Sequence, residues 1–339
     1  MVKRFLILVM AFLSGAFFTA CGEEKAPENA WRGIGPGADL TAVTERTEYF
    51  DLTVETEELF DLGLWEKNPE LYSVPLPNAG KIEIIYQPLG TQFLAGEPVQ
   101  IWSEITKDGA DIYLYREDGS RESLLQGISV DYASVDSKFK CYLDGEGSCF
   151  FYRTDFLMID GRDQYVGLIV KMLPTGEILY ENSLEPGFMI NDICQMEDGR
   201  IYLLLYNDKK NEQVLEELDS KTGRMISESR LQLFFGAVRL GTENGSPAVA
   251  GYGIGGSSGG IAAVDMEAQS TSGLLYLHGT SYGWHGDFSS LPLQDFQVLA
   301  DGSIEFLWTD GAGLNCFREV LRMEKVEKIR IVLRAIITD

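Results

Sequence analysis

The sequence predicts an all-β fold, and three observations support this. Short runs of β-prone residues alternate with turns, and the 36 glycines and 11% aromatic residues of this 339-residue chain favour turns and strands over helices. Asp-Gly and Thr-Gly pairs stand between the runs and supply the positive φ angles that tight turns need. The pattern recurs about every 50 residues. Four strands in each repeat predict a β-propeller of roughly five to six four-stranded blades.

The clearest repeat is the stretch from residue 189 to residue 231. Its first strand leads into the turn at Asp198-Gly199, and Arg200–Tyr206 forms the returning strand. Gln213–Leu218 is a third strand, and Met225–Leu231 is a fourth. One antiparallel sheet of this length has the size of a propeller blade.

The other repeats are placed by the same signals. Strands are predicted at Lys81–Tyr86, Val99–Ile105, Asp111–Arg116, Ser148–Tyr152, Gly167–Leu173, Ile261–Asp265 and Ser303–Trp308. Asn244-Gly245 marks a degenerate fourth unit, and Ile261–Asp265 is read as its next strand. We expect the C-terminal strand Ile329–Thr338 to close the ring against an N-terminal strand, which removes both sheet edges. A β-sandwich is the alternative fold, but it would not produce the repeat.

The N-terminus predicts export. A basic start, Met1–Arg4, precedes the apolar run Phe5–Phe18, which has the length of a signal peptide and is too short to span a membrane comfortably. The segment that ends at Cys21, Phe-Thr-Ala-Cys, resembles the lipobox of bacterial lipoproteins, with Phe18 where Leu is usual. The resemblance implies a lipid on Cys21 that anchors the protein at the extracytoplasmic face of the membrane. The alternative is an ordinary secretory signal.

The predicted organisation has three parts. Residues 1–20 are the signal peptide, residues 21–40 form a tether rich in proline, glycine and charge, and residues 41–339 form the propeller domain. The net charge of −24 argues against nucleic acid and anionic lipid as partners, so membrane contact is expected only through the lipid on Cys21.

Cysteine and histidine contents exclude common metal and redox frameworks. Cys141 and Cys149 flank a turn and are candidates for a disulfide across a hairpin, while single buried thiols are the other reading for them and for Cys194 and Cys316. No cysteine pair has zinc-ligand spacing, and the chain has 2 histidines. No metal and no cofactor are expected.

Two catalytic motif matches arise from glycine-rich composition. Residues 251–256 fit GxGxxG, but no helix is predicted after them. Residues 256–260 fit GxSxG, which as a nucleophile elbow requires a strand-to-helix turn in an α/β sheet. Both matches are read as a loop in the degenerate unit, and no catalytic residue is assigned.

The best candidate for a binding loop is Tyr276–Phe288. It combines aromatic and polar side chains in a glycine-broken segment, and the predicted ligand-binding residues are Tyr282, Trp284, His285 and Asp287. Aromatic faces beside polar groups suit stacking on sugar rings or other planar ligands. The alternative reading is an aromatic plug between neighbouring blades.

A family resemblance adds a functional expectation. The lipobox, the tether and the motifs at 198–204 (DGRIYLL) and 218–223 (LDSKTG) resemble bacterial surface lipoproteins in which a β-propeller precedes an extracellular solute-binding domain, which is not found after residue 333. The resemblance implies a module that binds a surface ligand or protein and is linked to uptake of carbohydrate or peptide. We therefore expect a binding or scaffold module rather than an enzyme, and the alternative is a propeller-fold hydrolase or lyase acting on an extracellular substrate.

Overall fold

The computed structural model describes residues 5–7, 39–60, 84–134, 138–233, 236–252, 258–278, 293–309 and 316–336. They belong to two compact units. The first unit comprises Met1–Thr53 with Met323–Asp339, and the second comprises Val54–Arg322. In the first unit the short strand β1 (Phe5–Ile7) pairs antiparallel with β2 (Asp39–Leu59), with Phe5 opposite Leu52.

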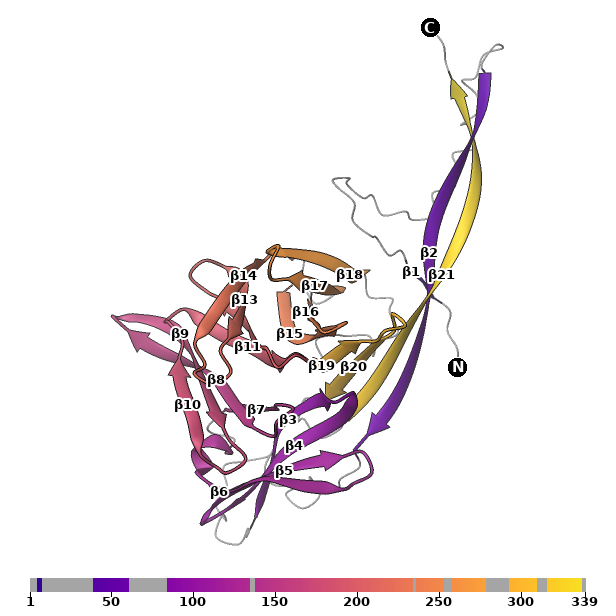
Figure 1. Cartoon of the computed structure of the whole chain (residues 1–339). Helices are drawn as coiled ribbons and strands as arrows, with labels where there is room; N and C mark the ends of the chain where they lie inside the picture. The colour runs from indigo at the N-terminus through magenta and orange to yellow at the C-terminus, as the bar shows by residue number, and fades with distance from the viewer. Residues whose placement is uncertain are drawn as a thin grey trace. The chain divides into compact units, whose positions relative to one another are not determined.

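The second unit is a β-propeller of five blades, counted over its described residues (Figure 1). Four blades are antiparallel meanders in chain order. Blade 1 is β3 (Ile85–Leu94), β4 (Glu97–Thr106), β5 (Gly109–Arg116) and β6 (Arg121–Ile128). Blade 2 is β7 (Lys140–Leu143), β8 (Cys149–Ile159), β9 (Arg162–Met172) and β10 (Ile178–Ser183). Blade 3 is β11 (Phe188–Gln195), β12 (Ile201–Asn207), β13 (Glu212–Leu218) and β14 (Met225–Leu231). Blade 4 is β15 (Gly236–Glu243), β16 (Ser246–Tyr252), β17 (Ser258–Asp265) and β18 (Ser270–His278).

Blade 5 is built from both ends of the second unit. Its strands β19 (Leu293–Val298), β20 (Ile304–Thr309) and β21 (Cys316–Ile336) are followed in the sheet by β2. The end of β2 packs there, because Leu59 and Phe60 form a buried cluster with Leu307 and Cys316. An N-terminal strand does pair with the C-terminal strand, as β2 is the neighbour of β21, but β21 begins at Cys316, and Ile329–Thr338, the residues expected to close the ring, belong to the first unit.

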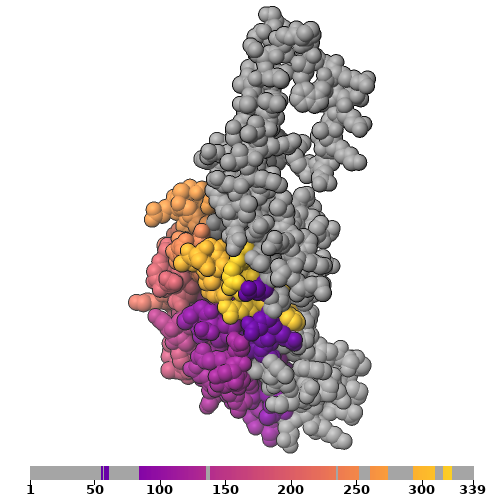
Figure 2. Space-filling model, turned by 90° about the vertical axis from the view of Figure 1, so that its right-hand side faces the viewer, coloured from indigo at the N-terminus to yellow at the C-terminus, as the bar shows by residue number. Residues whose placement is uncertain are grey.

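The innermost strands of the blades surround a common centre and make the contacts that close the ring. The inner strand of blade 4 pairs in parallel with that of blade 5, with Thr242 opposite Gln297. Blade 5 joins blade 1 through the Phe93 amide, which donates to Asp295. On the face seen in Figure 2, the purple residues of blade 1 lie beside the yellow residues of blade 5.

Hydrophobic clusters fill the spaces between neighbouring blades. Fully buried Ile101 and Ile112 of blade 1 pack in one cluster with Phe151 and Val170 of blade 2. A second cluster joins blades 2 and 3, and a third joins blades 3 and 4. Alternate residues of each strand point to opposite faces, so a blade enclosed between two others buries both faces. The burial of Ile201–Leu205, five consecutive residues of β12, shows this arrangement.

The turns form where the Asp-Gly pairs predicted them. Gly199 has φ of 86°, its N–H donates to Met196 O at 2.9 Å, and the Met196 N–H donates to Arg200 O at 2.8 Å. Gly302 repeats this geometry in blade 5, with φ of 82°. A positive φ strongly favours glycine, so these positions set the hairpins and the repeat.

Three elements differ from the sequence prediction. β3 begins at Ile85 and continues through Pro88 to Leu94, which is possible because a register shift at Pro88 removes the need for its N–H. β16 (Ser246–Tyr252) was not predicted, since its small side chains lack strong β propensity. β17 begins at Ser258 and not at the predicted Ile261, so the end of the GxSxG match lies in a strand where a loop was expected; a nucleophile elbow would require a helix there. Among the described residues no helix is long and apolar enough to span a membrane.

Candidate functional site

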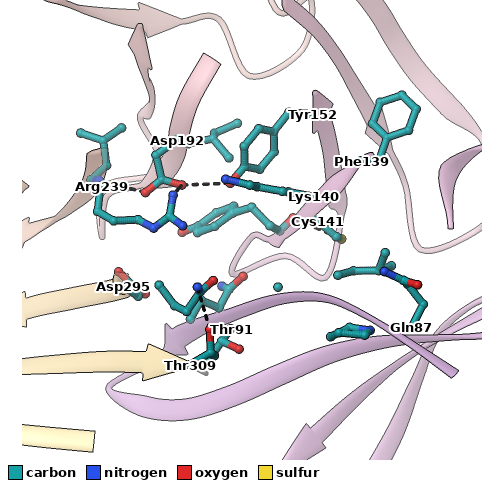
Figure 3. Close-up of a pocket in the computed structure, with 18 residues that line it drawn as sticks. Gln87, Thr91, Phe139, Lys140, Cys141, Tyr152, Asp192, Arg239, Asp295 and Thr309 are labelled. Carbon is teal, nitrogen blue, oxygen red and sulfur yellow. Dashed lines mark hydrogen bonds and ion pairs between the residues drawn. The ribbon is translucent and has the colours of Figure 1, made fainter. Parts of the chain in front are cut away.

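A pocket with a volume of about 280 Å³ lies where the inner strands meet, and every blade contributes to it. Most of its lining residues belong to inner strands, with Tyr152 from β8 and Thr309 from β20 (Figure 3). The lining consists of Gln87, Pro88, Leu89, Gly90, Thr91, Gln92, Phe139, Lys140, Cys141, Tyr142, Tyr152, Asp192, Ile193, Arg239, Leu240, Gln294, Asp295 and Thr309.

The same local distortion recurs in four of the inner strands. The pairing of each inner strand with its neighbour shifts register by one residue, and the residues that follow the shift are Gly90, Asp192, Arg239 and Asp295. A bulge of this kind bends the strand and changes the direction of the next side chain. All four residues line the pocket, so the bulges place one residue from each blade at equivalent positions around the centre.

Lys140 is the equivalent residue of blade 2. It precedes Asp144 by the same interval at which Asp192 precedes Met196, and Asp144 and Met196 make the same turn hydrogen bond. The five positions, named here the central ring, are Gly90, Lys140, Asp192, Arg239 and Asp295. In chain order the central ring therefore has an uncharged residue followed by a cation, an acid, a cation and an acid.

Asp192 connects three blades. Its Oδ1 accepts a hydrogen bond from the Tyr152 hydroxyl at 2.9 Å, and its Oδ2 accepts one from the Leu240 N–H at 2.9 Å. The Arg239 guanidinium lies 3.9 Å from Asp192 Oδ1. Burial raises the pKa of Asp192, and the charges of Arg239 and Lys140 oppose that shift together with the hydrogen bonds.

Asp295 and Arg239 connect the remaining blades. Asp295 Oδ2 accepts from the Phe93 N–H and Oδ1 from the Phe296 N–H, both at 2.7 Å. Arg239 donates through Nε to Leu293 O at 2.5 Å and through Nη1 to Asn191 O at 3.3 Å. Burial raises the pKa of Asp295 to about 8, with a further contribution from Asp192, so this carboxyl group is mostly protonated at neutral pH.

Lys140 differs from the other charged members of the ring. Its side chain lines the pocket and is exposed to solvent, and its Nζ lies 5.9 Å from the centroid of the Tyr152 ring. Lys140 and Tyr152 stand opposite each other in the β7–β8 pair, which places both side chains on one face. The charge of Arg239 lowers the pKa of Lys140 to about 8, together with the partial loss of water around an amine that lies among pocket residues, while Asp192 acts in the opposite direction.

Gly90, the member of the central ring from blade 1, has no space for a side chain. A Cβ atom at this residue would lie 2.3 Å from the carbonyl oxygen of Cys141 in the adjacent inner strand. The absence of a side chain therefore permits the close approach of blades 1 and 2 beside the pocket.

The described cysteines are buried free thiols, as one of the two readings of the sequence predicted. Cys141 stands opposite Phe151 and Cys149 stands opposite Leu143, so the two cysteines are diagonal and not direct cross-strand neighbours. Diagonal residues have Cα atoms about 7–8 Å apart, beyond the usual span of a disulfide. No group of metal-ligating side chains suited to an ion is found among the described residues.

The predicted binding residues Tyr282, Trp284, His285 and Asp287, together with the lipidation site Cys21, lie outside the described residues. The first four precede β19, which brings Gln294 and Asp295 to the pocket.

Sequence reasoning missed the central ring, although a signal for it exists. Lys140 stands seven residues before Gly147, and the same interval separates Asp192 from Gly199 and Asp295 from Gly302. All three glycines have positive φ at the inner hairpin. Counting back from the turn glycine therefore identifies the ring position in each of these blades.

Comparison with known proteins identifies no family for this chain. No family model matches it, and no curated protein matches it. Among solved structures, it is similar to a GH43 β-1,3-galactosidase with galactodeoxynojirimycin, with 10% identity, a TM-score of 0.43 and coverage of 68% of this chain and 89% of that chain.

Two further similar structures are exo-β-1,3-galactanases. For the enzyme from Clostridium thermocellum the identity is 14% and the TM-score 0.42, with coverage of 74% of this chain and 61% of that chain. For the enzyme from Phanerochaete chrysosporium with β-1,3-galactotriose, the identity is 15% and the TM-score 0.43, with coverage of 69% of this chain and 60% of that chain. At these levels of similarity the function of this chain has to be argued from its own residues.

Proposed function

We propose that this chain is a lipid-anchored, extracytoplasmic β-propeller that binds a small polyhydroxylated ligand of the saccharide class in its central pocket. The observation that carries the proposal is the central ring, in which hydrogen-bond donors and acceptors alternate around one pocket. The sequence features that end at Cys21 support the proposed location.

The pocket chemistry matches the requirements of a sugar. Each hydroxyl group both donates and accepts hydrogen bonds, so a polyol needs both kinds of partner in close alternation. Lys140 supplies donors, whereas Asp192 retains acceptor capacity because each of its oxygens accepts a single hydrogen bond within the protein. The side chains of Gln294 and Thr309, which bond to each other at 2.9 Å, add a neutral pair of both kinds.

The size of the pocket limits the ligand. Its volume of about 280 Å³ is at the lower end of ligand sites, which commonly occupy about 300–1,000 Å³. A monosaccharide or one terminal residue of a glycan is therefore the expected occupant. The predicted loop residues Trp284 and His285 are proposed to contact the same ligand, because Trp faces stack on sugar rings.

The proposal is tested by calorimetric titration with a panel of monosaccharides and disaccharides. Lys140→Met removes the donor without breaking an ion pair with a described residue, so we expect affinity to fall about tenfold or more while the melting temperature stays unchanged. Lys107→Met, in the exposed β4–β5 turn, is the matched control and should bind normally. Equal binding by both variants, or no saccharide binding by the wild type, would contradict the proposal.

A second candidate function, glycoside hydrolysis, is favoured by the two carboxyl groups that line the pocket. Glycosidases commonly use one protonated and one ionised carboxyl group, and the raised pKa of Asp295, about 8, keeps it protonated at neutral pH. Asp192 would be the second group. Each Asp295 oxygen already accepts one backbone N–H, so its acidic proton has to occupy a remaining lone-pair position.

Turnover separates the two candidates. Aryl glycosides of the sugars that bind are incubated with wild type, with Asp295→Asn, and with Asp163→Asn as an exposed control. Hydrolysis that is lost in Asp295→Asn, with an unchanged melting temperature, supports the enzyme. Saccharide binding without any turnover supports the binding module.

A further inference from the structure

Lys140 is the cation of the central ring that forms no ion pair with a described residue. Arg239, in contrast, donates to the backbone carbonyls of Leu293 and Asn191 and so connects strands. The Lys140 side chain extends beside Tyr152 toward Asp192, as Figure 3 shows. No carboxylate of a described residue lies within ion-pair distance of this amine, although the charge of Asp192 acts on it.

The surroundings of this amine favour its neutral form. Charged and titratable groups face the pocket from four other strands, namely Tyr152 on β8, Asp192 on β11, Arg239 on β15 and Asp295 on β19. Arg239 disfavours a second positive charge nearby, and the pKa of Lys140 is lowered to about 8. At pH 7.5 about a quarter of such an amine is neutral, against about one part in a thousand for an ordinary lysine.

A neutral lysine amine inside a pocket is a nucleophile toward carbonyl carbon. We propose that Lys140 captures a small aldehyde or ketone in the central pocket as a reversible imine. This is a covalent activity beyond the proposed saccharide binding, and it does not depend on that function.

The step balances without an external oxidant or reductant. The nitrogen lone pair attacks the carbonyl carbon, a C–N bond forms, and the carbonyl oxygen takes up a proton to give a carbinolamine. The hydroxyl group then leaves as water while the C=N bond forms. Both hydrogen atoms of that water come from the amine nitrogen, and Asp192, a carboxyl group that lines the same pocket, would relay them.

Neighbouring groups restrict the ligand to a small one. The pocket volume of about 280 Å³ and the charged side chains of the central ring suit short hydroxylated carbonyl compounds, such as glycolaldehyde or glyceraldehyde. The hydroxyl groups of such a compound would bond to the same donors and acceptors as a sugar.

The test is reductive trapping. The folded protein is incubated with glycolaldehyde and cyanoborohydride at pH 7.5, and labelled lysines are quantified by peptide mass spectrometry. We expect Lys140 to be labelled at least about tenfold faster than exposed Lys107, because a larger fraction of its amine is neutral. In the unfolded protein the two rates should become equal.

Two variants complete the experiment. Lys140→Arg retains the charge and removes the nucleophile, so the label at this position disappears while the melting temperature is retained. Arg239→Met should raise the pKa of Lys140 and slow its labelling. Measuring the labelling rate of Lys140 against pH gives this pKa even if the variant is less stable than the wild type. Labelling of Lys140 no faster than Lys107 in the folded wild type would overturn the proposal, whether or not saccharides bind.

Discussion

Replacement of Glu216 by Gln should stabilise the propeller, and it should do so only above about pH 5. Glu216 lies on β13 and is only 9% exposed, and it stands directly opposite Glu228 of β14. Like charges that face each other across strands are destabilising. Burial, then Glu228 and Glu185, raises the pKa of Glu216 from 4.5 to about 7.

The sign and size of the change in the free energy of unfolding follow from this pKa shift. The folded protein binds the Glu216 proton more tightly than the unfolded chain does, so stability is lost as pH rises from about 4.5 to 7 and the whole penalty is present above pH 7. The pKa shift corresponds to a loss of roughly 3 kcal/mol in the free energy of unfolding. Solvent screens the charges of exposed Glu228 and Glu185, which reduces the expected loss to about 1–3 kcal/mol. Gln does not ionise and avoids the penalty.

The assay is urea unfolding of wild type and Glu216→Gln at pH 4.5 and pH 8. Equal free energies of unfolding are expected at the lower pH, and a gain of about 1–3 kcal/mol for the variant at the higher pH. Glu177→Gln, at an exposed position, measures the general effect of removing one charge from this acidic chain. If both variants gain the same amount at pH 8, the reasoning from burial and cross-strand repulsion is wrong.

Four other outcomes are expected. Gly199→Val should lower the free energy of unfolding by about 1–3 kcal/mol, because a β-branched residue resists the φ of 86°; an unchanged melting temperature would contradict this. Gly90→Ala should cost about 1–3 kcal/mol, since its Cβ would meet the Cys141 carbonyl at 2.3 Å; thermal melts detect the loss, and native stability would show that the strands can separate. Cys21→Ser should move the protein from the membrane to the soluble fraction, and continued membrane association would refute the lipid anchor. Trp284→Ala should weaken saccharide binding by roughly 1–3 kcal/mol in calorimetry without lowering the melting temperature, whereas a large loss of stability would identify a core residue.

The blades were predictable because local signals define them. The strands of blade 3 were expected between residues 189 and 231, and β11–β14 extend from Phe188 to Leu231. A turn position that requires positive φ is occupied by glycine in most cases, so the turns at Gly199 and Gly302 can be predicted without any tertiary information. Where the signal was weak, as in the small residues of β16, the strand was missed.

The pocket could not be predicted in the same way, because its residues differ in type and are far apart in the chain. Lys140, Asp192 and Arg239 share a structural position but not a chemical character, so the repeat does not reveal them by composition. Their common direction depends on bulges, and a bulge is defined by pairing with another strand. The aromatic loop at Tyr282–Asp287 attracted attention because its unusual residues are adjacent in sequence.

The shared construction of blade 5 has a consequence for how the protein is made. Strand β2 is synthesised before the other four blades, but β20 and β21, which complete its sheet, come after them. Pairings between distant segments slow folding, so the final closure should be the late event in reaching the native state. Until then β21 presents an open edge, and β2 of a neighbouring molecule has the same sequence as the missing strand. At high protein concentration, refolding chains are therefore expected to exchange β2 and form swapped dimers.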